Sequence, residues 1–350
     1  MKNKSLFFFI EGLSNKGGTE RIAITLANRC IKEGYKVHLI SLENITNYAY
    51  KINPLISIHS LSHKWNKRIS AIWKLRTIIK KYQPDYIINV GMPMGQISIP
   101  ASLGLKTRII NWEHFNLYAG SKLGYYWRLL AAKLAYATVV LTQKDKQNYL
   151  KKVNANILNI PNFTDNFIDV ISPLDSNIIL TIGRLAPQKG YDMLIKAWEI
   201  VSCNNPDWKL YIVGDGNDEQ LLKKQAKILS ISDSIHFIPA TNNIECYFKK
   251  ASIYVMSSRF EGLPMVLIEA KMCGIPCVSF ICPNGPDEII QHNIDGILVE
   301  YGNIEHLAIA IITLINNRNK ICEYGMAGKK DALTKYTSNA VINQWNNLFI

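Results

Sequence analysis

Apolar positions along this chain follow two alternating patterns. Short continuous apolar runs are typical of strands that are buried on both faces of a parallel sheet. Longer segments, in which apolar residues recur every three or four positions, are typical of helices with one buried face. For the first half these patterns predict strands at Leu6–Ile10, Lys36–Leu42, Asp85–Val90, Thr107–Trp112 and Ala137–Leu141, and helices at Thr19–Glu33, Lys64–Lys81 and Ser121–Leu134.

The second half repeats this alternation. Its predicted elements are the strands Asn177–Ile182, Trp208–Val213, Ser234–Ile238, Ser252–Met256 and Pro276–Ser279, and the helices Tyr191–Cys203, Asp218–Leu229, Pro264–Met272 and Ile304–Ile315. Strands that alternate with helices are typical of parallel, doubly wound sheets. Because 350 residues exceed the usual size of one domain, we expect two α/β domains, with the polar, turn-rich stretch 161–176 as the linker.

The composition favours a folded protein and excludes a disordered one. Apolar residues make up 48% of the chain and aromatic residues 10%, enough for two hydrophobic cores. The seven cysteines include no Cys-x-x-Cys pair, and no histidine stands at ligand spacing from Cys273, Cys277 and Cys282, so we expect buried thiols rather than a metal site. No apolar run has the length of a signal peptide core or of a transmembrane helix, which favours a cytoplasmic location.

Positive charge is concentrated in the first half of the chain. Residues 1–165 hold 24 Lys or Arg and 8 Asp or Glu, a net charge of +16, whereas residues 166–350 hold 16 and 19, a net charge of −3. This asymmetry favours a polyanionic partner for the first half, such as a membrane surface, a lipid diphosphate or a nucleic acid. The basic, tryptophan-bearing stretch Lys64–Lys81 and the aromatic stretch Tyr125–Leu130 are either anchors on an anionic bilayer or ordinary surface helices.

Two glutamates eight positions apart, Glu261 and Glu269, are the main candidates for ligand contacts. Glu261 follows the predicted strand Ser252–Met256, so it lies at the carboxyl edge of a sheet, where open α/β folds bind ligands. Glu269 lies inside an apolar helix, where a carboxylate needs a partner such as a ligand hydroxyl. Gly262 and the start of that helix offer backbone N–H groups to an anion such as a diphosphate. The segment therefore predicts a nucleotide-sugar site.

The run from Ser257 to Ala270 resembles the Glu-x7-Glu signature of retaining family 4 glycosyltransferases of GT-B fold. The resemblance implies that Glu261 contacts the donor sugar and stabilises positive charge at its anomeric carbon, and that Glu269 binds the ribose hydroxyls. It assigns the intervening backbone to the donor diphosphate, at Gly262, Leu263, Pro264, Met265 and Val266. Without the resemblance, a solvated loop glutamate followed by a helix glutamate paired with a lysine would explain the same spacing.

Other loops also resemble parts of this family. The segment from Gly183 to Gly190 is similar to its diphosphate-binding loop, in which Arg184 offers a bidentate fork and Lys189 a point charge. The first strand–helix turn, with Gly17 and Gly18, is similar to its amino-terminal loop. The strand end at Gly214 and Asp215 corresponds to the place where a nucleoside packs against the backbone. In this family a histidine at a strand end of the first domain faces the donor sugar across the cleft, and the resemblance implies that role for His114.

The resemblance implies two doubly wound, Rossmann-like domains facing a central cleft. Residues 1–165 would bind the acceptor, residues 166–335 the nucleotide-sugar donor, and 336–350 would form a helix that crosses back to the first domain. The implied reaction moves a hexose or N-acetylhexosamine from a UDP-sugar, with retention, to a polyprenyl-diphosphate-linked or other glycan acceptor. The segment Asn284–Ile290 resembles transferases of bacterial surface polysaccharides, such as O-antigen and capsule, and of lipid-linked oligosaccharides. We expect a peripheral protein at the inner face of the cytoplasmic membrane.

We expect no metal or cofactor, because the chain has no Asp-x-Asp motif and Arg184 and Lys189 can neutralise the leaving diphosphate. Two other classes of function remain open. A sugar-nucleotide epimerase shares the GT-B fold but transfers no sugar. A basic, non-enzymatic protein that binds polyanions would explain the charge, but no helix-turn-helix, RNA-recognition or zinc motif supports nucleic acid as its ligand.

Overall fold

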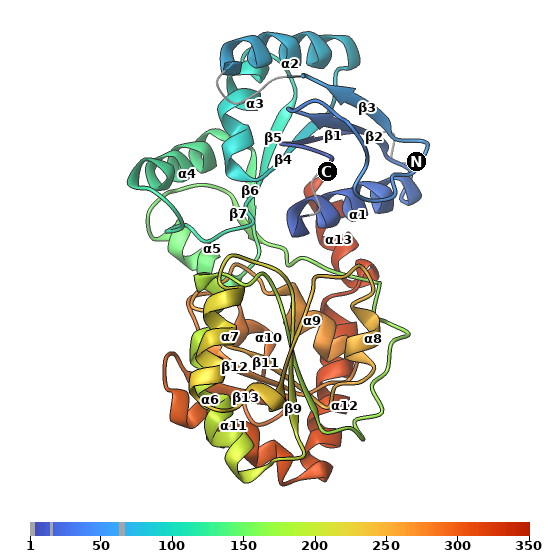
Figure 1. Ribbon diagram of the computed structural model, residues 1–350. Helices are drawn as coiled ribbons and strands as arrows, with labels where there is room; N and C mark the ends of the chain where they lie inside the picture. The colour runs from blue at the N-terminus through green and yellow to red at the C-terminus, as the bar shows by residue number, and fades with distance from the viewer. Residues whose placement is uncertain (1–3, 15–16, 63–66) are drawn as a thin grey trace. The chain divides into compact units, whose positions relative to one another are not determined.

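The computed structural model describes residues 4–14, 17–62 and 67–350, and the chain folds into two compact units (Figure 1). Unit 1 consists of Met1–Phe163 and Val341–Ile350, and unit 2 of Thr164–Ala340. Each unit contains one fully parallel sheet with helices in the connections between strands. The predicted α/β class with two doubly wound, Rossmann-like domains is confirmed.

Within the described part of unit 1, seven parallel strands form a sheet in the order β3-β2-β1-β4-β5-β6-β7. From β1 the chain continues to β2 and β3 on one side of the sheet and then to β4 and the later strands on the other side. The strand order therefore reverses between β1 and β4. The strands are β1 (Ser5–Ile10), β2 (Lys36–Ser41), β3 (Ser57–Ser60), β4 (Tyr86–Val90), β5 (Arg108–Trp112), β6 (Ala137–Val140) and β7 (Ile157–Asn159). The helices are α1 (Gly18–Lys32), α2 (Arg68–Tyr82), the 3-10 turn η2 (Met92–Met94), α3 (Gly95–Ser102), α4 (Lys122–Leu134) and α5 (Gln143–Leu150).

Local sequence explains where α4 and α5 begin. The Ser121 hydroxyl accepts a hydrogen bond from the Gly124 N–H at 3.1 Å, and the Thr142 hydroxyl accepts one from the Asp145 N–H at 3.2 Å. Such N-caps satisfy backbone donors that the first helical turn leaves unpaired. The two caps fix the start of α4 after the loop that follows β5, and the start of α5 just beyond the carboxyl end of β6.

The last helix, α13 (Ser338–Leu348), begins in unit 2 and ends in unit 1. Its Trp345 packs edge-on against Trp112 of β5, with ring centroids 5.0 Å apart. Phe349, directly after the helix, lies 5.4 Å from the Tyr86 ring, and the Tyr86 hydroxyl donates a 2.7 Å hydrogen bond to the Ile350 carbonyl. Trp345 and Phe349 are therefore buried in unit 1, whereas the side chain of Ile350 is exposed.

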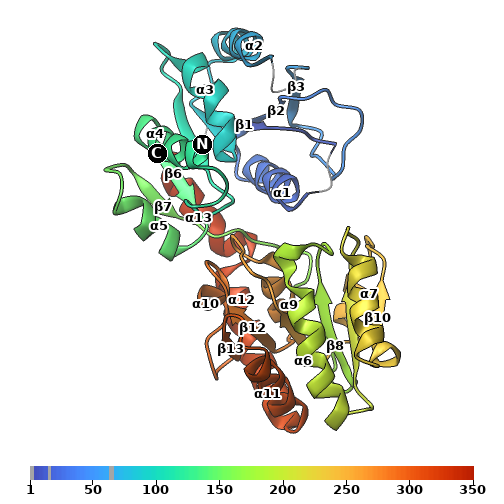
Figure 2. The same ribbon diagram turned by 60° about the vertical axis from the view of Figure 1, so that its left-hand side comes forward.

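Six parallel strands form the sheet of unit 2, counted over its described residues, in the order β10-β9-β8-β11-β12-β13. Figure 2 labels β8, β10, β12 and β13 of this sheet. They are β8 (Ile178–Ile182), β9 (Lys209–Val213), β10 (Ile235–Ile238), β11 (Ile253–Met256), β12 (Cys277–Ile281) and β13 (Gly296–Glu300). The helices are α6 (Tyr191–Asn204), α7 (Glu219–Ile228), α8 (Glu245–Phe248), α9 (Met265–Met272), α10 (Pro286–Ile289), α11 (Ile304–Ile315) and α12 (Arg318–Lys335), with the 3-10 turns η3 (Pro187–Lys189) and η4 (Ser232–Ser234).

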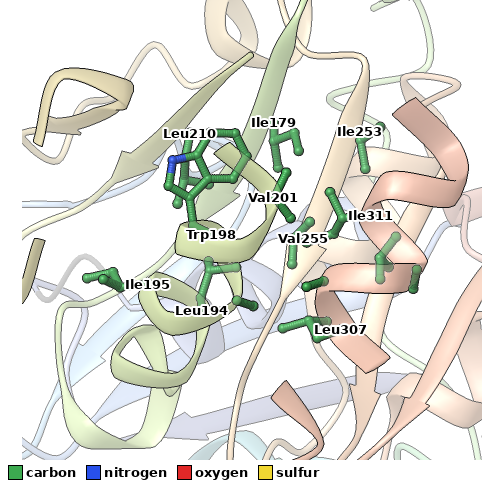
Figure 3. Close-up of a cluster of buried hydrophobic side chains, with 14 of the residues drawn as sticks. Ile179, Leu194, Ile195, Trp198, Val201, Leu210, Ile253, Val255, Leu307 and Ile311 are labelled. Atoms are coloured by element: carbon green, nitrogen blue, oxygen red, sulfur yellow. The ribbon is translucent and has the colours of Figure 1, made fainter. Parts of the chain in front are cut away.

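The core of unit 2 joins this sheet to α6 and α11 (Figure 3). The buried Trp198 of α6 packs beside Leu210 of β9, and Leu307 and Ile311 come from α11. The large apolar side chains of the sheet and of the two helices stabilise the fold roughly in proportion to the apolar area that they remove from water. This packing fixes the strand ends from which the loops of the next section emerge.

Several elements escaped prediction from the sequence. The strands β3 and β7 are short and lie at the two edges of their sheet. The helix α3 contains Pro100 and has no polar face. In α12, Gly325 interrupts the apolar pattern, but a β-carbon there would lie 2.1 Å from the Gly274 carbonyl oxygen, so glycine lets the two segments approach. The strand β13 and the short helices α5, α8 and α10 were not predicted either. For the elements that were predicted, the observed bounds differ by a few residues, and Lys64 to Asn66, at the start of the predicted Lys64–Lys81 helix, lie outside the described residues.

The sequence predicted that no segment is long and apolar enough to span a membrane, and that three clustered cysteines are buried thiols. Every helix in the described part of the chain is too short or too polar to span a bilayer. Cys273, Cys277 and Cys282 are all buried and free, as predicted. Burial raises the pKa of the Cys282 thiol to about 12, so it stays protonated.

Candidate active site

In unit 2, two loops meet at the carboxyl ends of the neighbouring strands β8 and β11, where the strand order reverses. Arg259, after β11, pairs with Asp192 through two hydrogen bonds of 2.8 and 2.7 Å. It also donates to the Pro187 carbonyl at 2.7 Å. The Ser257 hydroxyl donates to the Lys189 carbonyl at 2.9 Å. These contacts hold the β8 loop and the β11 loop against each other.

Glu261 and Lys189 meet where the two loops touch. The Lys189 Nζ lies 2.7 Å from the Glu261 Oε1, and the Ser258 hydroxyl donates to the same oxygen at 2.6 Å. Only 8% of Glu261 is exposed. A carboxylate so deeply placed needs such charged and hydrogen-bonding partners. The sequence suggested Lys189 as a contact for a diphosphate, and the structure brings it to Glu261.

Glycine is required at two positions of this junction. Gly190 has a φ of 64°, and a β-carbon there would lie 2.1 Å from the Ser257 carbonyl oxygen. Gly214, at the end of β9, has a φ of 150°, and its β-carbon would lie 2.0 Å from the Gly183 carbonyl oxygen. Side chains at these positions would separate the strand ends. The predicted Gly214 therefore lies directly beside the β8 loop.

The segment after Glu261 leads into α9. Pro264 is the residue before the helix, with a φ of −71° and a ψ of 97°, so α9 begins at Met265, one residue later than predicted. Leu263 is buried, whereas Gly262, Met265 and Val266 are partly exposed. These residues form the turn and the first helical residues at the carboxyl edge of the sheet.

Glu269 is buried in α9, as the sequence suggested. The sequence also allowed Glu269 to pair with a lysine, and α9 contains Lys271. The Lys271 Nζ lies 2.8 Å from both Asp295 and Asp331. This ion cluster links α9 to α12 and to the turn before β13, so Lys271 serves the packing of unit 2.

Arg184 and Asp215 lie beside the same loops. Arg184 is exposed, and within the residues that the structure describes it makes no ion pair. Asp215 accepts a hydrogen bond from the Ala240 N–H at 3.0 Å through its carboxylate, and one from the Leu185 N–H at 2.8 Å through its carbonyl. Asp215 thus ties the ends of β8 and β10 together.

The remaining predicted residues belong to unit 1. His114 follows β5, is 8% exposed, and packs 4.7 Å from the Trp112 ring. Its Nε2 is buried and has no hydrogen-bond partner among the described residues. Burial lowers the pKa of His114 to about 3, so the imidazole is neutral near pH 7. A buried, neutral and unpaired ring nitrogen is suited to a ligand hydrogen bond.

Gly17 and Gly18 lie at the start of α1, beyond β1. Gly17 is extended, and its carbonyl accepts a hydrogen bond from the Tyr50 hydroxyl at 3.1 Å. Gly18 is the first helical residue, and a β-carbon there would contact nothing within 4 Å among the described residues. Asn15 and Lys16, which belong to the same predicted turn, lie outside the described residues.

Glu113, directly before His114, forms an ion pair with Arg128 of α4 that the sequence did not predict. The Arg128 Nε lies 2.8 Å from the Glu113 Oε2, and the glutamate is 1% exposed. Burial raises the pKa of Glu113 to about 7, although the positive charge of Arg128 opposes this shift. A carboxylate directly before a candidate histidine at a strand end was the available signal.

A cavity of about 780 Å³ lies elsewhere in unit 1, lined by Lys4, Lys106, Arg108 and the end of α2. It opens at the amino-terminal ends of β1, β4 and β5, whereas His114 follows the carboxyl end of β5. The strand direction therefore separates this cavity from the candidate residues. Over the described parts of the chain, no three His, Cys, Asp or Glu side chains are arranged to hold a metal ion.

Comparison with known proteins identifies the family of this chain. Residues 162–331 match the family model "Glycosyl transferases group 1", and residues 16–166 match "Glycosyltransferase Family 4". An uncharacterized glycosyltransferase of Haemophilus influenzae is 34% identical over 99% of both chains. The chain belongs to the family 4 glycosyltransferases of GT-B fold. It is a hexosyltransferase.

Two further relatives act in the synthesis of bacterial glycans, according to their names. The amylovoran biosynthesis glycosyltransferase AmsD of Erwinia amylovora is 30% identical over 98% of this chain and 99% of its own. An α-1,4-N-acetyl-D-galactosaminyltransferase of Campylobacter jejuni, which acts on a diNAcBac-PP-undecaprenol glycan, is 31% identical over 89% of both chains.

Solved structures share the fold. A mutant of S. aureus TarM, in complex with Fondaparinux, alpha-GlcNAc-glycerol and UDP, superposes with a TM-score of 0.86 at 16% identity over 99% of both chains. Anabaena HepE, in complex with UDP and glucose, superposes with a TM-score of 0.81 at 17% identity over 98% of both chains. At these identities the likeness concerns the fold alone.

Proposed function

We propose that this protein is a retaining glycosyltransferase that moves a hexose or N-acetylhexosamine from a UDP-sugar to a glycan acceptor in bacterial surface polysaccharide synthesis. The observation that carries the proposal is the Lys189–Glu261–Ser258 cluster at the carboxyl edge of the unit 2 sheet. It combines a preorganised carboxylate with a cation at the place where α/β folds bind ligands. The UDP in TarM and HepE and the roles named for the relatives support the donor and the pathway class.

In the proposed reaction the bond between the anomeric carbon and the diphosphate oxygen breaks as the acceptor oxygen bonds to the same face of that carbon. The departing phosphate oxygen takes the proton of the acceptor hydroxyl, so no separate protein base is needed. Glu261 stabilises the positive charge that develops on the sugar. Arg184 and Lys189 stabilise the negative charge of the leaving diphosphate, without a metal ion.

The other candidate residues bind and orient the donor. The turn and helix start of Gly262, Leu263, Pro264, Met265 and Val266 receive the diphosphate, since helix starts attract anions. Glu269 accepts hydrogen bonds from the ribose hydroxyls, and Gly214 and Asp215 border the nucleoside. In unit 1, Gly17 and Gly18 approach the phosphate or the sugar, and the unpaired His114 nitrogen contacts the donor sugar.

We also propose that residues 1–165 bind the acceptor, 166–335 the donor, and that 336–350 return the chain to the first domain. A polyprenyl-diphosphate-linked acceptor fits the net charge of +16 over residues 1–165 and the undecaprenol-linked substrate named for the Campylobacter relative. An acceptor of this kind lies in a membrane, so the protein would work at the cytoplasmic face of a bilayer.

The outer face of α4 is the best candidate for that membrane contact. Its stripe consists of four exposed apolar side chains at helical spacing, Leu123, Tyr126, Leu130 and Leu134. Lys122 and Lys133 lie exposed beside it. Exposed apolar residues flanked by lysines are typical of interfacial helices. The predicted Tyr125–Leu130 patch lies in the same helix, but two of its residues serve the fold. Trp127 donates a hydrogen bond to the Met92 carbonyl, and Arg128 pairs with Glu113.

Two basic residues of α2 also serve the fold. Lys74 donates a 3.1 Å hydrogen bond to the Leu61 carbonyl, and Arg76 donates to the carbonyls of Ala101 and Leu103. Ile69 and Trp73 remain exposed on this helix. We therefore place α2 second to α4 as a membrane contact.

The test of the proposed function is a donor screen followed by a transfer assay. Thermal unfolding is measured with a panel of UDP- and GDP-sugars, because a bound ligand raises the stability of the folded state. The best donor is then incubated with and without undecaprenyl-diphosphate-linked glycans in the presence of EDTA. Sugar transfer that needs an acceptor supports the proposal, whereas conversion of the donor alone would identify an epimerase. Loss of transfer in EDTA would contradict the metal-free mechanism.

A further inference from the structure

The loop that follows β5 in unit 1, Glu113–Ala119, is held by buried charged groups. The Glu113 Oε1 accepts a hydrogen bond from the Phe115 N–H at 3.1 Å, and its Oε2 faces Arg128 Nε at 2.8 Å. The second contact of Arg128 is a 2.7 Å hydrogen bond to the Ala119 carbonyl. Arg128 thus connects the first residue of the loop to the last.

A second carboxylate holds the middle of the loop. The Leu117 N–H donates to Asp145 Oδ1 at 3.0 Å, and Asp145 is placed by the Thr142 cap at the start of α5. The loop is therefore fixed by α4 through Arg128 and by α5 through Asp145. His114, whose Nε2 has no partner in the described chain, lies between these two attachments.

Stability alone is a poor explanation for a buried ion pair in this position. Removing two charges from water costs several kcal/mol per ion, and apolar side chains of similar volume often stabilise a fold as well or better. What a buried pair with saturated hydrogen bonds does provide is one defined geometry. Both Glu113 oxygens are occupied by the loop and by Arg128, so the carboxylate is not available to a substrate.

We propose that Glu113 is a positioning residue: with Arg128 it fixes the Glu113–Ala119 loop and thereby the orientation of His114 toward the reacting sugar. This inference rests on the proposed role of His114. It predicts that Glu113 affects turnover without affecting binding of the donor diphosphate, whose proposed charged contacts, Arg184 and Lys189, lie in unit 2.

The groups around Glu113 make this positioning sensitive to pH. It faces Arg128 from α4, and Asp145 and Tyr149 from α5. The Tyr149 phenol stays protonated because burial raises its pKa well above 10. Burial raises the pKa of Glu113 to about 7, so its ion pair with Arg128 weakens as the pH falls below neutrality. Turnover should therefore have an acid limb near pH 7.

The experiment compares Glu113→Gln and Glu113→Asp with the wild-type protein. We expect Glu113→Gln to lower kcat by about 10- to 100-fold, the usual cost of misplacing a catalytic group. Its UDP affinity should stay within about twofold, because only loss of a direct contact changes affinity by more. The acid limb of kcat should vanish in Glu113→Gln and return in Glu113→Asp. Amide hydrogen exchange of the 113–121 peptide should become at least about tenfold faster in Glu113→Gln.

The matched control is Glu33→Gln, which removes an ion pair with Arg29 in α1 of the same unit. It should leave kcat, the acid limb and the exchange of the 113–121 peptide unchanged. If Glu33→Gln and Glu113→Gln changed hydrogen exchange and turnover equally, the positioning role of Glu113 would be overturned. An unchanged acid limb in Glu113→Gln would overturn it as well.

If Glu113→Gln does not fold, the double variant Glu113→Gln with Arg128→Met removes both charges and tests the same loop. Absence of sugar transfer by the wild type with every donor would refute the proposed function. The hydrogen-exchange comparison would still decide whether Glu113 fixes the loop.

Discussion

The two candidate loops of this protein bury their ion pairs to different degrees. In unit 2, Glu261 pairs with Lys189, whose side chain is still 20% exposed, at a junction of two loops from neighbouring strands. In unit 1, Glu113 pairs with Arg128 in the interior, and His114 beside it is neutral because burial lowers its pKa to about 3. The less buried pair can exchange its partner for a ligand at lower cost, whereas the more deeply buried pair keeps its geometry. The first arrangement suits charge stabilisation, and the second suits positioning.

The strongest test of this contrast is Glu261→Ala. We expect transfer to fall by about 10²- to 10³-fold, the usual cost of removing a preorganised group that stabilises the transition state. The fold should survive, because the partly exposed Lys189 can turn to solvent. Turnover with the best donor and thermal unfolding measure the two effects. Near wild-type turnover would remove Glu261 from the mechanism.

The pH dependence of stability should have opposite signs for Glu113 and His114. Folding raises the pKa of Glu113 from 4.5 to about 7, so between these values the native state binds more protons than the unfolded state. The free energy of unfolding should therefore fall as pH rises through this range, by up to about 3 kcal/mol relative to Glu113→Gln. Denaturant unfolding of both proteins at pH 4.5 to 7.5 measures this difference.

His114 supplies the opposite slope. Folding lowers its pKa from 6.5 to about 3, so its contribution to stability is present above pH 6.5 and is lost as the pH falls toward 3. Wild type should therefore lose stability relative to His114→Gln on acidification. If Glu113→Gln and His114→Gln changed the pH dependence of the free energy of unfolding in the same way, burial would not control the pKa values of Glu113 and His114.

The two cations of the unit 2 site should differ in what they change. Arg184→Ala and Lys189→Ala should each weaken UDP binding by about 1.5–3 kcal/mol, the usual loss for a charge-assisted contact. Lys189→Ala should also lower turnover, because it leaves the Glu261 carboxylate without its cation, whereas Arg184 makes no contact with Glu261. Calorimetry measures the UDP affinity of each variant, and steady-state kinetics measures its kcat. Unchanged UDP affinity in both variants would place the diphosphate elsewhere.

The smallest expected effect concerns the surface of α4. Lys122→Gln with Lys133→Gln should weaken co-sedimentation with phosphatidylglycerol vesicles by about 1 kcal/mol per charge, and high salt should weaken it further. Lys249→Gln with Lys250→Gln, which removes two exposed charges from unit 2, is the control and should have no effect. Equal losses in both double variants would mean that α4 is not the contact. Binding of wild type to neutral vesicles would contradict an electrostatic attachment.

The fold class could be predicted because parallel strands buried on both faces leave continuous apolar runs in the sequence. β1, for example, is buried at every position from Leu6 to Ile10. The edge strand β3 carries only Ser57 to Ser60, and three of its four residues are polar, so it gives no such run. The helix α12 was missed because Gly325 looks like a helix breaker, although it allows a backbone contact that exists only in the fold.

The unit 2 loops could be predicted because their residues are contiguous. The run around Glu261 follows a recognisable strand and precedes a recognisable helix, so its place at the sheet edge follows from topology. The pairing of Lys189 with Glu261 could not be predicted in this way, because 72 residues separate them. It exists because β8 and β11 are neighbours in the sheet.

The sequence alone determined the alternation of strands and helices, the concentration of positive charge in residues 1–165, and the motifs at the strand ends. The tertiary structure alone decided which charged groups lie in the interior and which partners they meet. Glu113 and Arg128 lie fifteen positions apart in a strand end and a helix, and no local pattern pairs them. Their protonation depends on how much water the packing of β5, α4 and α5 removes, because desolvation acts through all neighbouring atoms at once.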